Sequence, residues 1–436
     1  MLGHTRLAGL VAITVWFTAV VLSTAGASQD VFRGHGGPVR ALAVAPEGAT
    51  AISGSFDQSA IIWSISTGSA IAVLRFHDGA VNAAAAIPNG RFATAGEDGR
   101  IAIWKTGESA PLQTFEEHDG PIVALAISPN GQEIASASWD ETASVRSLAN
   151  GQSKTFRGHH GNVNAVGFLP DGRLVSAGYD TTLRIWQRES ESGPASVVTL
   201  GSPVNALTVS KQGEIIIAGA DGVVSFFDSE AKLKASVETQ EVPITSVALS
   251  TDDSRIAAAS IGGTITIIDR QTAKVLFRIA GTKQPVWALA FRSDGRELLS
   301  GGNDRLIRRW NAANGEPIGN VAENSPPDIL AQYAGDRGAE LFRACVACHT
   351  LKHDAENRAG PSLNHVFGRR IATAPGYNFS PALKKLDIIW NAETIGKLFE
   401  IGPSRYTPGT KMPEQRIEDA ADRAALIRFL ERATTN

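Results

Sequence analysis

The chain has 436 residues, which is more than a single domain usually contains. Its 41 basic and 44 acidic residues nearly balance, giving a net charge of −3 at pH 7. This balance excludes the strongly basic class of nucleic-acid-binding proteins. Acidic residues are in excess before residue 328 and basic residues after residue 331, which we interpret as the charge of a solvated surface.

The first 27 residues have the composition of an export signal. Arg6 supplies positive charge, residues 7–22 are largely apolar, and Ala25-Gly26-Ala27 is a small-x-small cleavage site. The apolar run is shorter than the ~20 residues that a membrane span needs. We therefore expect cleavage after Ala27 and no membrane span afterwards, with an uncleaved N-terminal membrane anchor as the alternative.

A repeat extends from about residue 31 to residue 321. In most copies a turn residue precedes a bulky apolar residue by six positions, as Asp57 precedes Trp63. The seven turn positions, which follow one another at intervals of 40 to 42 residues, are Asp57, Asp98, Asp140, Asp180, Asp221, Gly262 and Asp304. This period predicts a β-propeller with four strands in each blade.

Each copy also has the alternation of apolar and polar residues that strands require, as in residues 39–44. Seven four-stranded sheets in a ring bury the faces that one sheet would leave exposed. A strand from one terminus must complete the last blade, and residues 30–33 and 316–321 are both candidates.

The repeat resembles the WD-repeat family in its Gly-His element. This element appears as Gly34-His35 and Gly158-His159, and His77 and His118 lie in the same register. The resemblance implies an all-β, seven-bladed propeller that acts as a platform for a protein partner.

Hydroxyl, imidazole and carboxylate residues recur together in the repeats. A hydrolase would use the same residue types in a catalytic triad, but a single catalytic centre would not recur in several blades. In the WD-repeat family such a set resembles a hydrogen-bond network that ends on the strand tryptophan and braces a turn, so we expect no catalytic residues here. The sets are His35, Ser53 and Asp57; His77, Thr94 and Asp98; and His159, Ser176 and Asp180.

A short, polar and proline-containing segment follows the repeats. It covers residues 322–328 and predicts a linker between a propeller at 28–321 and a second domain at 329–436. Helices are expected in this second domain at about 329–346, 392–400 and 417–432.

Near its start the second domain contains the run Cys345-Val346-Ala347-Cys348-His349, which is the Cys-x-x-Cys-His attachment pattern of c-type haem. A structural zinc site would need a second cysteine pair, and a thioredoxin-like pair would need a βαβ context. Met412 lies in a Pro/Gly-rich loop, where a methionine is less expected as core filler. We expect one covalent haem c on Cys345 and Cys348, with His349 and Met412 as its axial iron ligands.

From about residue 331 to residue 436 the sequence resembles a class I cytochrome c of the mitochondrial type, an all-α fold. The resemblance implies that the Pro361 carbonyl supports the proximal histidine, that Arg369, Tyr377 and Trp390 contact the haem propionates, and that Tyr406 packs near the haem. Phe379 and Phe399 depart from it, since close relatives often have tyrosine there. The matching residues are Gly338, Phe342, Gly360-Pro361, Phe367-Gly368-Arg369, Ala374-Pro375-Gly376-Tyr377, Ile388-Ile389-Trp390, Leu426 and Phe429.

With both axial positions filled, such a haem transfers single electrons and has no open site for a substrate. We expect an exported, periplasmic bacterial electron carrier rather than an enzyme, with redox partner proteins and a further protein partner on the propeller. One alternative is an oxidoreductase with a second cofactor or substrate site in the propeller, and another is a haem redox sensor. Quinoprotein dehydrogenases and some nitrite reductases also join a propeller to a cytochrome c domain, but their propellers typically have eight blades and lack WD-type repeats.

Overall fold

The structure is a computed structural model of the chain. It describes residues 31–187, 193–241, 243–281, 283–318, 330–343, 345–347, 349–351, 360–375, 377, 379, 381–408, 410, 412 and 416–434. The predicted signal peptide (1–27), the predicted linker (322–328) and Cys348 lie outside the described residues.

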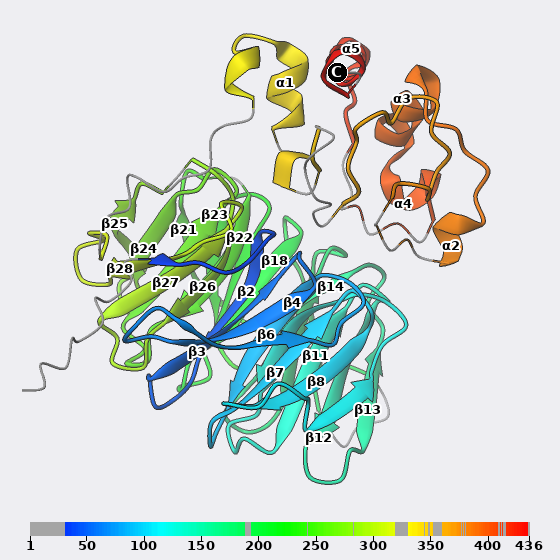
Figure 1. The fold of residues 1–436 in the computed structure, drawn as a ribbon. Coiled ribbons are helices and arrows are strands. Elements are labelled where there is room, and N and C mark those ends of the chain that lie inside the picture. Colours follow the sequence, from blue (N-terminus) through cyan, green and yellow to red (C-terminus); the bar gives the residue numbers. More distant parts are fainter. Residues whose placement is uncertain are drawn as a thin grey trace, which may run out of the picture.

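Seven four-stranded antiparallel sheets make up the N-terminal part (Figure 1). The strands of the first four sheets are β2 (Val39–Val44), β3 (Thr50–Ser55), β4 (Ser59–Ser64) and β5 (Ala70–Arg75); β6 (Val81–Ile87), β7 (Arg91–Gly96), β8 (Arg100–Lys105) and β9 (Gln113–Glu116); β10 (Ile122–Ile127), β11 (Glu133–Ser138), β12 (Thr142–Ser147) and β13 (Ser153–Arg157); and β14 (Val163–Phe168), β15 (Leu174–Gly178), β16 (Thr182–Trp186) and β17 (Ser196–Thr199). The other three contain β18 (Val204–Val209), β19 (Ile215–Gly219), β20 (Val223–Phe227) and β21 (Leu233–Glu238); β22 (Ile244–Leu249), β23 (Arg255–Ser260), β24 (Ile265–Asp269) and β25 (Lys274–Ile279); and β26 (Val286–Phe291), β27 (Glu297–Gly302), β28 (Ile307–Asn311) and β1 (Val31–Phe32).

The first strand along each repeat lies innermost, and these seven strands form a closed ring. Each of β2, β6, β10, β14, β18, β22 and β26 contacts the next, and β26 contacts β2. The predicted seven-bladed propeller is therefore confirmed.

Both candidate segments contribute to the closure of the last blade. Strand β1 pairs antiparallel with the first half of β28, where Val31 lies opposite Arg308. Beyond it, Pro317 bridges to Trp310, and the Ile318 amide donates to the Arg309 carbonyl at 2.9 Å. The N-terminal strand supplies the ladder, and the chain that leaves β28 turns back to extend it.

The propeller core lies in the seams between blades. At the seam where the ring closes, Phe32 packs on Trp63 of the neighbouring blade with ring centroids 5.5 Å apart. Phe32, Trp63 and Ile307 are each about 1% exposed. The second strands of the blades, such as β3, β7 and β11, are buried along almost their whole length.

The C-terminal part is helical. Its elements are η1 (Ala331–Tyr333), α1 (Arg337–Phe342), η2 (Cys345–Ala347), α2 (Pro381–Lys384), α3 (Ala392–Ile401), α4 (Pro403–Tyr406) and α5 (Ala420–Thr434).

The prediction of one continuous helix at 329–346 was wrong, because the chain forms the three short helices η1, α1 and η2 there. Gly335 takes a left-handed backbone conformation with φ of 81°, which interrupts the helix. Asp336 then caps α1 by accepting from the amides of Gly338 and Ala339. The helices expected at 392–400 and 417–432 correspond to α3 and α5.

Helices α1 and α5 cross at close range. A Cβ on Gly338 would lie 2.2 Å from the Ala425 carbonyl oxygen, so only glycine permits this approach. Next to the crossing, Phe342 packs on Phe429 with ring centroids 5.4 Å apart, and both side chains are fully buried. This crossing places η2, which follows α1, at the inner side of the helical domain.

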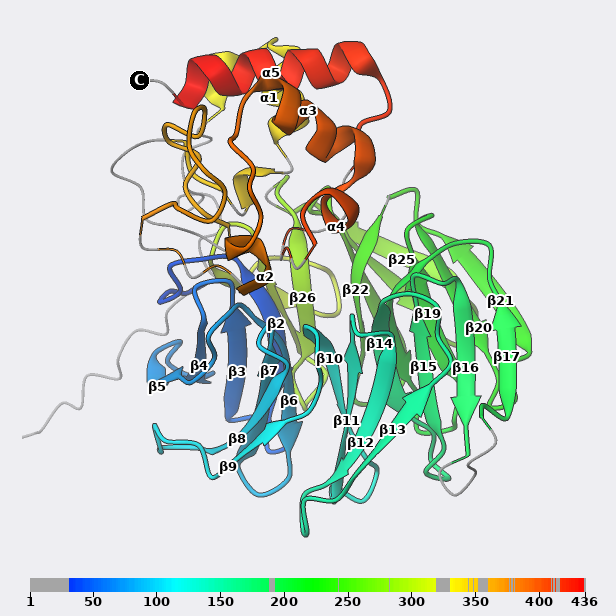
Figure 2. The ribbon, with the colours of Figure 1, turned by 90° about the vertical axis from the view of Figure 1, so that its right-hand side faces the viewer.

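Figures 1 and 2 both show the helical domain over one end of the propeller, with α2 and α4 toward the sheets and α5 farthest from them. Among the described residues, no helix is both long and apolar enough to cross a membrane.

Phe32→Ala should destabilise the closed ring, because it removes a buried side chain from the strand that completes the last blade. We expect a loss of about 3–5 kcal/mol in the free energy of unfolding of the propeller. Denaturant unfolding followed by tryptophan fluorescence measures it. Val73→Ala, at a side chain that is 44% exposed, is the control, and equal stability of the two variants would contradict the closure role of β1.

Candidate functional site

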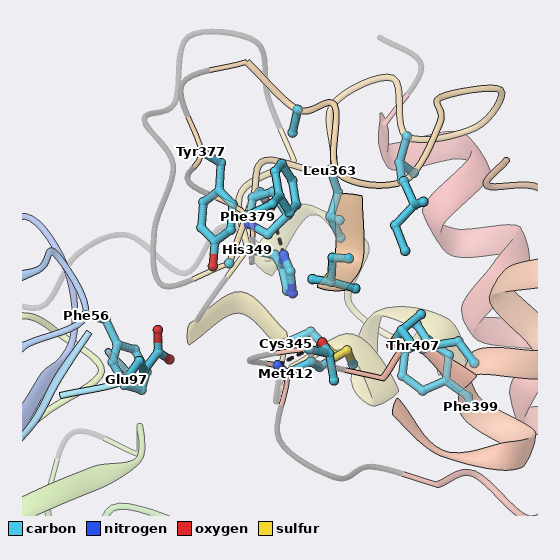
Figure 3. Close-up of a pocket in the computed structure, with 18 of the residues that line it drawn as sticks. Phe56, Glu97, Cys345, His349, Leu363, Tyr377, Phe379, Phe399, Thr407 and Met412 are labelled. Atoms are coloured by element: carbon cyan, nitrogen blue, oxygen red, sulfur yellow. Dashed lines mark hydrogen bonds between the residues drawn. The ribbon is translucent and has the colours of Figure 1, made fainter. Parts of the chain in front are cut away.

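A cavity of about 480 Å³ lies between the helical domain and the mouth of the propeller channel. This volume is within the ~300–1,000 Å³ typical of cofactor and ligand sites. Figure 3 shows Cys345, His349 and Met412 around the cavity, with Phe56 and Glu97 on the propeller side. Its helical side is mostly apolar, with Phe342, Leu363, Val366, Leu383, Ile395, Leu398, Phe399 and Leu430.

His349 is held in a defined orientation. Its amide donates to the Cys345 carbonyl at 2.9 Å, and its Nδ1 lies 2.8 Å from the Pro361 carbonyl oxygen. Because a carbonyl only accepts, Nδ1 is the protonated nitrogen and the lone pair is on Nε2. Such an imidazole is ready to ligate a metal through Nε2.

Gly360 makes this orientation possible. A Cβ at position 360 would lie 2.4 Å from Cε1 of His349. The backbone of residues 360–361 therefore lies flat against the imidazole, and the Pro361 carbonyl is within reach of Nδ1.

Cys345 is in η2, and only 8% of its surface is exposed. Burial raises the pKa of its thiol to about 12, so this cysteine is not a reactive thiolate of the kind used for nucleophilic catalysis. Its side chain lines the cavity beside His349. Cys348, the other predicted attachment residue, lies outside the described residues.

Met412 lines the same cavity and packs against the apolar core of the helical domain. Its amide donates to Oγ1 of Thr410 at 3.1 Å, and this bond constrains the loop that carries the thioether. An imidazole and a thioether that are 63 positions apart in sequence thus face one cavity.

Arg369, Trp390 and Tyr377 also line the cavity. Arg369 donates to the carbonyls of Ser362 (2.7 Å) and Asn364 (3.0 Å), and burial lowers the pKa of its guanidinium. Its backbone carbonyl accepts from the Trp390 amide at 2.9 Å, which keeps the two residues side by side. Tyr377 packs edge-on against Phe379, with ring centroids 4.7 Å apart.

Pro361 lines the cavity as well, whereas Tyr406, in α4, is not among the lining residues. Thr407, which follows Tyr406, does line it.

The residues present fit a haem. The cavity combines an oriented imidazole, a thioether, a buried thiol and an apolar wall, together with a part-buried guanidinium. Arg369 makes no ion pair within the described part of the chain, so an anionic group of the cofactor would meet an uncompensated cation. The described residues contain no cluster of three or more His, Cys, Asp or Glu side chains that would favour a polar metal site instead.

The recurrent sets of the propeller form hydrogen-bond networks, as predicted. In the first blade His35 bonds Asp57 through Nδ1 (3.1 Å) and Ser53 through Nε2 (2.7 Å), and the indole of Trp63 donates to Ser53 at 2.8 Å. The same arrangement recurs in the blades of His77 and His159. In the blade of His118 the tryptophan is replaced by Arg146. These networks brace turns inside the blades, apart from the cavity.

Sequence reasoning missed the propeller side of the cavity. The second residue of every innermost strand lines the channel mouth, next to the irregular pairing at which each strand begins. Their spacing of about one repeat was a usable signal, but only three of the seven side chains are of the same type, asparagine. They are Arg40, Asn82, Val123, Asn164, Asn205, Thr245 and Trp287.

Each of the two parts of the chain matches a known protein family. The family described as WD domain, G-beta repeat matches residues 26–64, 68–105, 109–146, 150–187 and 273–311. The family described as Cytochrome c matches residues 335–434.

Curated relatives resemble the C-terminal part. Cytochrome c of Arabidopsis thaliana is 40% identical over 108 residues, which are 24% of this chain and 96% of the relative. Cytochrome c of Cochliobolus lunatus is 41% identical over 99 residues, 22% of this chain and 91% of the relative. A cytochrome c homolog of Rickettsia felis is 37% identical over 113 residues, covering 25% of this chain and 64% of that protein.

Gly360→Ala should destabilise the helical domain, because the added methyl group collides with the His349 imidazole. We expect a loss of about 1–3 kcal/mol in the free energy of unfolding, the usual cost of overpacking. Gly396→Ala is the control, since a Cβ there would meet only Ile427 at 3.5 Å within helix α3. Thermal unfolding of both variants measures the difference, and a Gly360→Ala protein as stable as the control would contradict the close packing on His349.

The networks predict how the propeller responds to acid. Burial alone would raise the pKa of Asp98, but hydrogen bonds from His77 and from the amides of Asp78 and Arg100 lower it to about 2. This carboxylate therefore stabilises the fold above its unfolded pKa of about 4 and loses that contribution as the pH falls toward 2.

We expect Asp98→Asn to lower the free energy of unfolding at pH 7 by about 1–3 kcal/mol. Between about pH 4 and pH 2 the free energy of unfolding of this variant should decrease less than that of the wild type. Chemical unfolding at several pH values measures both. Asp119→Asn, at an exposed acid, should leave the profile unchanged. An Asp98→Asn profile parallel to the wild type would refute the shifted pKa.

Proposed function

Because the chain belongs to the cytochrome c family through its C-terminal domain and carries a seven-bladed propeller of WD repeats, we propose that it is an exported c-type cytochrome that transfers single electrons through one covalent haem. The observation that carries this proposal is that Cys345, His349 and Met412 line the same cavity. The proposal takes residues 1–27 as a signal peptide, 28–321 as the propeller, 322–328 as a linker and 329–436 as the cytochrome domain.

Cys345 and Cys348 are the proposed attachment residues. Each thiol would add across a haem vinyl group, with its proton going to the second vinyl carbon, to form a thioether. Burial of Cys345 supports this assignment, because a thioether in that place has no charge to solvate. Covalent attachment keeps the cofactor in the protein through repeated oxidation and reduction.

His349 and Met412 are the proposed axial ligands, and the bound haem would supply a reversible ferric–ferrous couple. The hydrogen bond from Nδ1 of His349 to the Pro361 carbonyl fixes the plane of the ring and would leave Nε2 to hold the iron. A thioether ligand favours the ferrous state and raises the potential relative to a second histidine. Two protein ligands leave no position for oxygen or substrate, which favours electron transfer over catalysis.

Arg369, Tyr377 and Trp390 are proposed to hold the haem propionates. The support is their common place on the cavity wall and the lack of a carboxylate partner for Arg369 among the described residues. Pro361 acts through His349, and we propose that Tyr406, in α4, packs near the haem.

We assign the protein to the periplasm of a bacterium on the composition of residues 1–27 and the need to attach c-type haem outside the cytoplasm. Redox proteins would exchange electrons with the cytochrome domain, and the propeller would bind a further protein. Export and these partners rest on the sequence and on the family resemblance.

Met412→Ala should leave the haem attached but lower its midpoint potential and let added imidazole bind the iron, because the sixth ligand is lost. Redox titration and imidazole difference spectra of the full chain measure these effects. Thr410→Ala, which alters the same loop but keeps the thioether, is the control. Wild-type potential and no imidazole binding in Met412→Ala would exclude Met412 as the ligand.

A further inference from the structure

The cavity has an excess of positive charge. Among the described lining residues, the basic and acidic side chains other than histidine are those of Arg40, Arg369, Arg370 and Glu97. Arg370 pairs with Asp387 at 3.4 Å. Arg40 and Arg369, one from each domain, make no ion pair with any described residue.

Arg40 is held at the mouth of the propeller channel. It is the second residue of β2, and its side chain is largely buried. It donates to the Trp287 carbonyl at 3.3 Å and lies over the Trp287 ring, 5.8 Å from its centre. These contacts fix the guanidinium in place but do not neutralise it, and burial lowers its pKa.

Trp287 adds a second donor at the same place. Its indole Nε1 is buried and has no hydrogen-bond acceptor in the described structure. A buried N–H without a partner costs about 1–3 kcal/mol, so such groups usually have an acceptor in the working protein. The comparable donor of Trp139 bonds Oδ1 of Asn164 at 3.0 Å.

A guanidinium without a counter-ion and an unpaired N–H fit a carboxylate, which accepts from both. Haem carries two propionate carboxylates, and the cavity offers two arginines that have no acidic partner among the residues that the structure describes. His349 and Arg40 line the same cavity, so a haem bound there and the Arg40 guanidinium would share one space.

We propose that the propeller completes the haem site of its own chain: Arg40, together with the indole N–H of Trp287, binds one haem propionate, while Arg369 binds the other. This inference rests on the proposed function, because it requires haem in the cavity. It makes the propeller mouth part of the cofactor site rather than only a surface for other proteins.

A cation bound to a propionate affects the iron electrostatically. The ferric haem carries one more positive charge than the ferrous haem, so a nearby guanidinium disfavours oxidation. Arg40 would therefore raise the midpoint potential, and the effect persists in salt because a buried charge is poorly screened. The docked propeller thus tunes the cytochrome that it carries.

The test uses the full-length, haem-loaded protein and four variants. Arg40→Gln removes the charge, Arg40→Lys keeps it, and Trp287→Phe removes only the indole N–H. Arg75→Gln, at an exposed arginine of the same blade, is the control. The readout is the midpoint potential from a spectroscopic redox titration.

We expect Arg40→Gln to shift the ferric–ferrous equilibrium up to about tenfold toward ferric, which is about 59 mV for one electron. Arg40→Lys should restore most of the wild-type value, and Trp287→Phe should shift the equilibrium the same way by a smaller factor. Arg75→Gln should match the wild type.

The inference is overturned if Arg40→Gln and Trp287→Phe have the potential of Arg75→Gln, or if Arg40→Lys shifts it as far as Arg40→Gln. Should Arg40→Gln fail to fold, Trp287→Phe alone decides between these outcomes. A wild-type protein without an attached, low-spin haem would refute the proposed function itself, which separates the two failures.

Discussion

The hydrogen bond between Nδ1 of His349 and the Pro361 carbonyl is the contact on which the candidate haem site depends. It sets the tautomer of the imidazole and the direction in which the other nitrogen points. It exists because Gly360 has no side chain and lets the backbone approach the ring. The crossing of α1 and α5 at Gly338 in turn positions η2, from which His349 follows.

The propeller contributes a rigid rim to the same site. Its seven innermost strands form a closed ring, so the second residues of these strands are brought together at one mouth. Closure depends on β1, which joins the beginning of the repeat region to its last blade. In the blades where the network of imidazole, carboxylate and hydroxyl is complete, it ties the turn after the second strand to the strands beneath it. A buried network of this kind stiffens the scaffold.

Much of this architecture could be predicted from local patterns. The spacing of Asp57 and its equivalents gave the number of blades, and the run from Cys345 to His349 indicated the haem. Local patterns did not predict the features that depend on contacts between distant residues or on an unusual backbone conformation. Residues 317–318 help to close the ring by pairing with Arg309 and Trp310 of β28, and the local pattern of residues 317–318 does not reveal this pairing. The break at Gly335 depends on a backbone conformation that the apolar pattern of the segment does not record.

The position of the propeller mouth was the least predictable feature. Arg40 and Trp287 are nearly the whole repeat region apart in sequence, and neither has the same residue type as its equivalents in other blades. Only closure of the ring brings them together, and only the placement of the helical domain brings them to its cavity. Their proposed role follows from charge and hydrogen bonding, which periodicity does not reveal.

The most direct test of the central claim is the absorption spectrum of the full-length protein, exported in a host that attaches c-type haem, together with its haem content after denaturation. The account predicts one low-spin c-type haem for each chain, retained when the protein is unfolded, and no other chromophore. A protein that lost its haem on unfolding, or that carried none, would contradict covalent attachment at Cys345 and Cys348. The bands of a second haem or a quinone would contradict the carrier function and favour an enzyme.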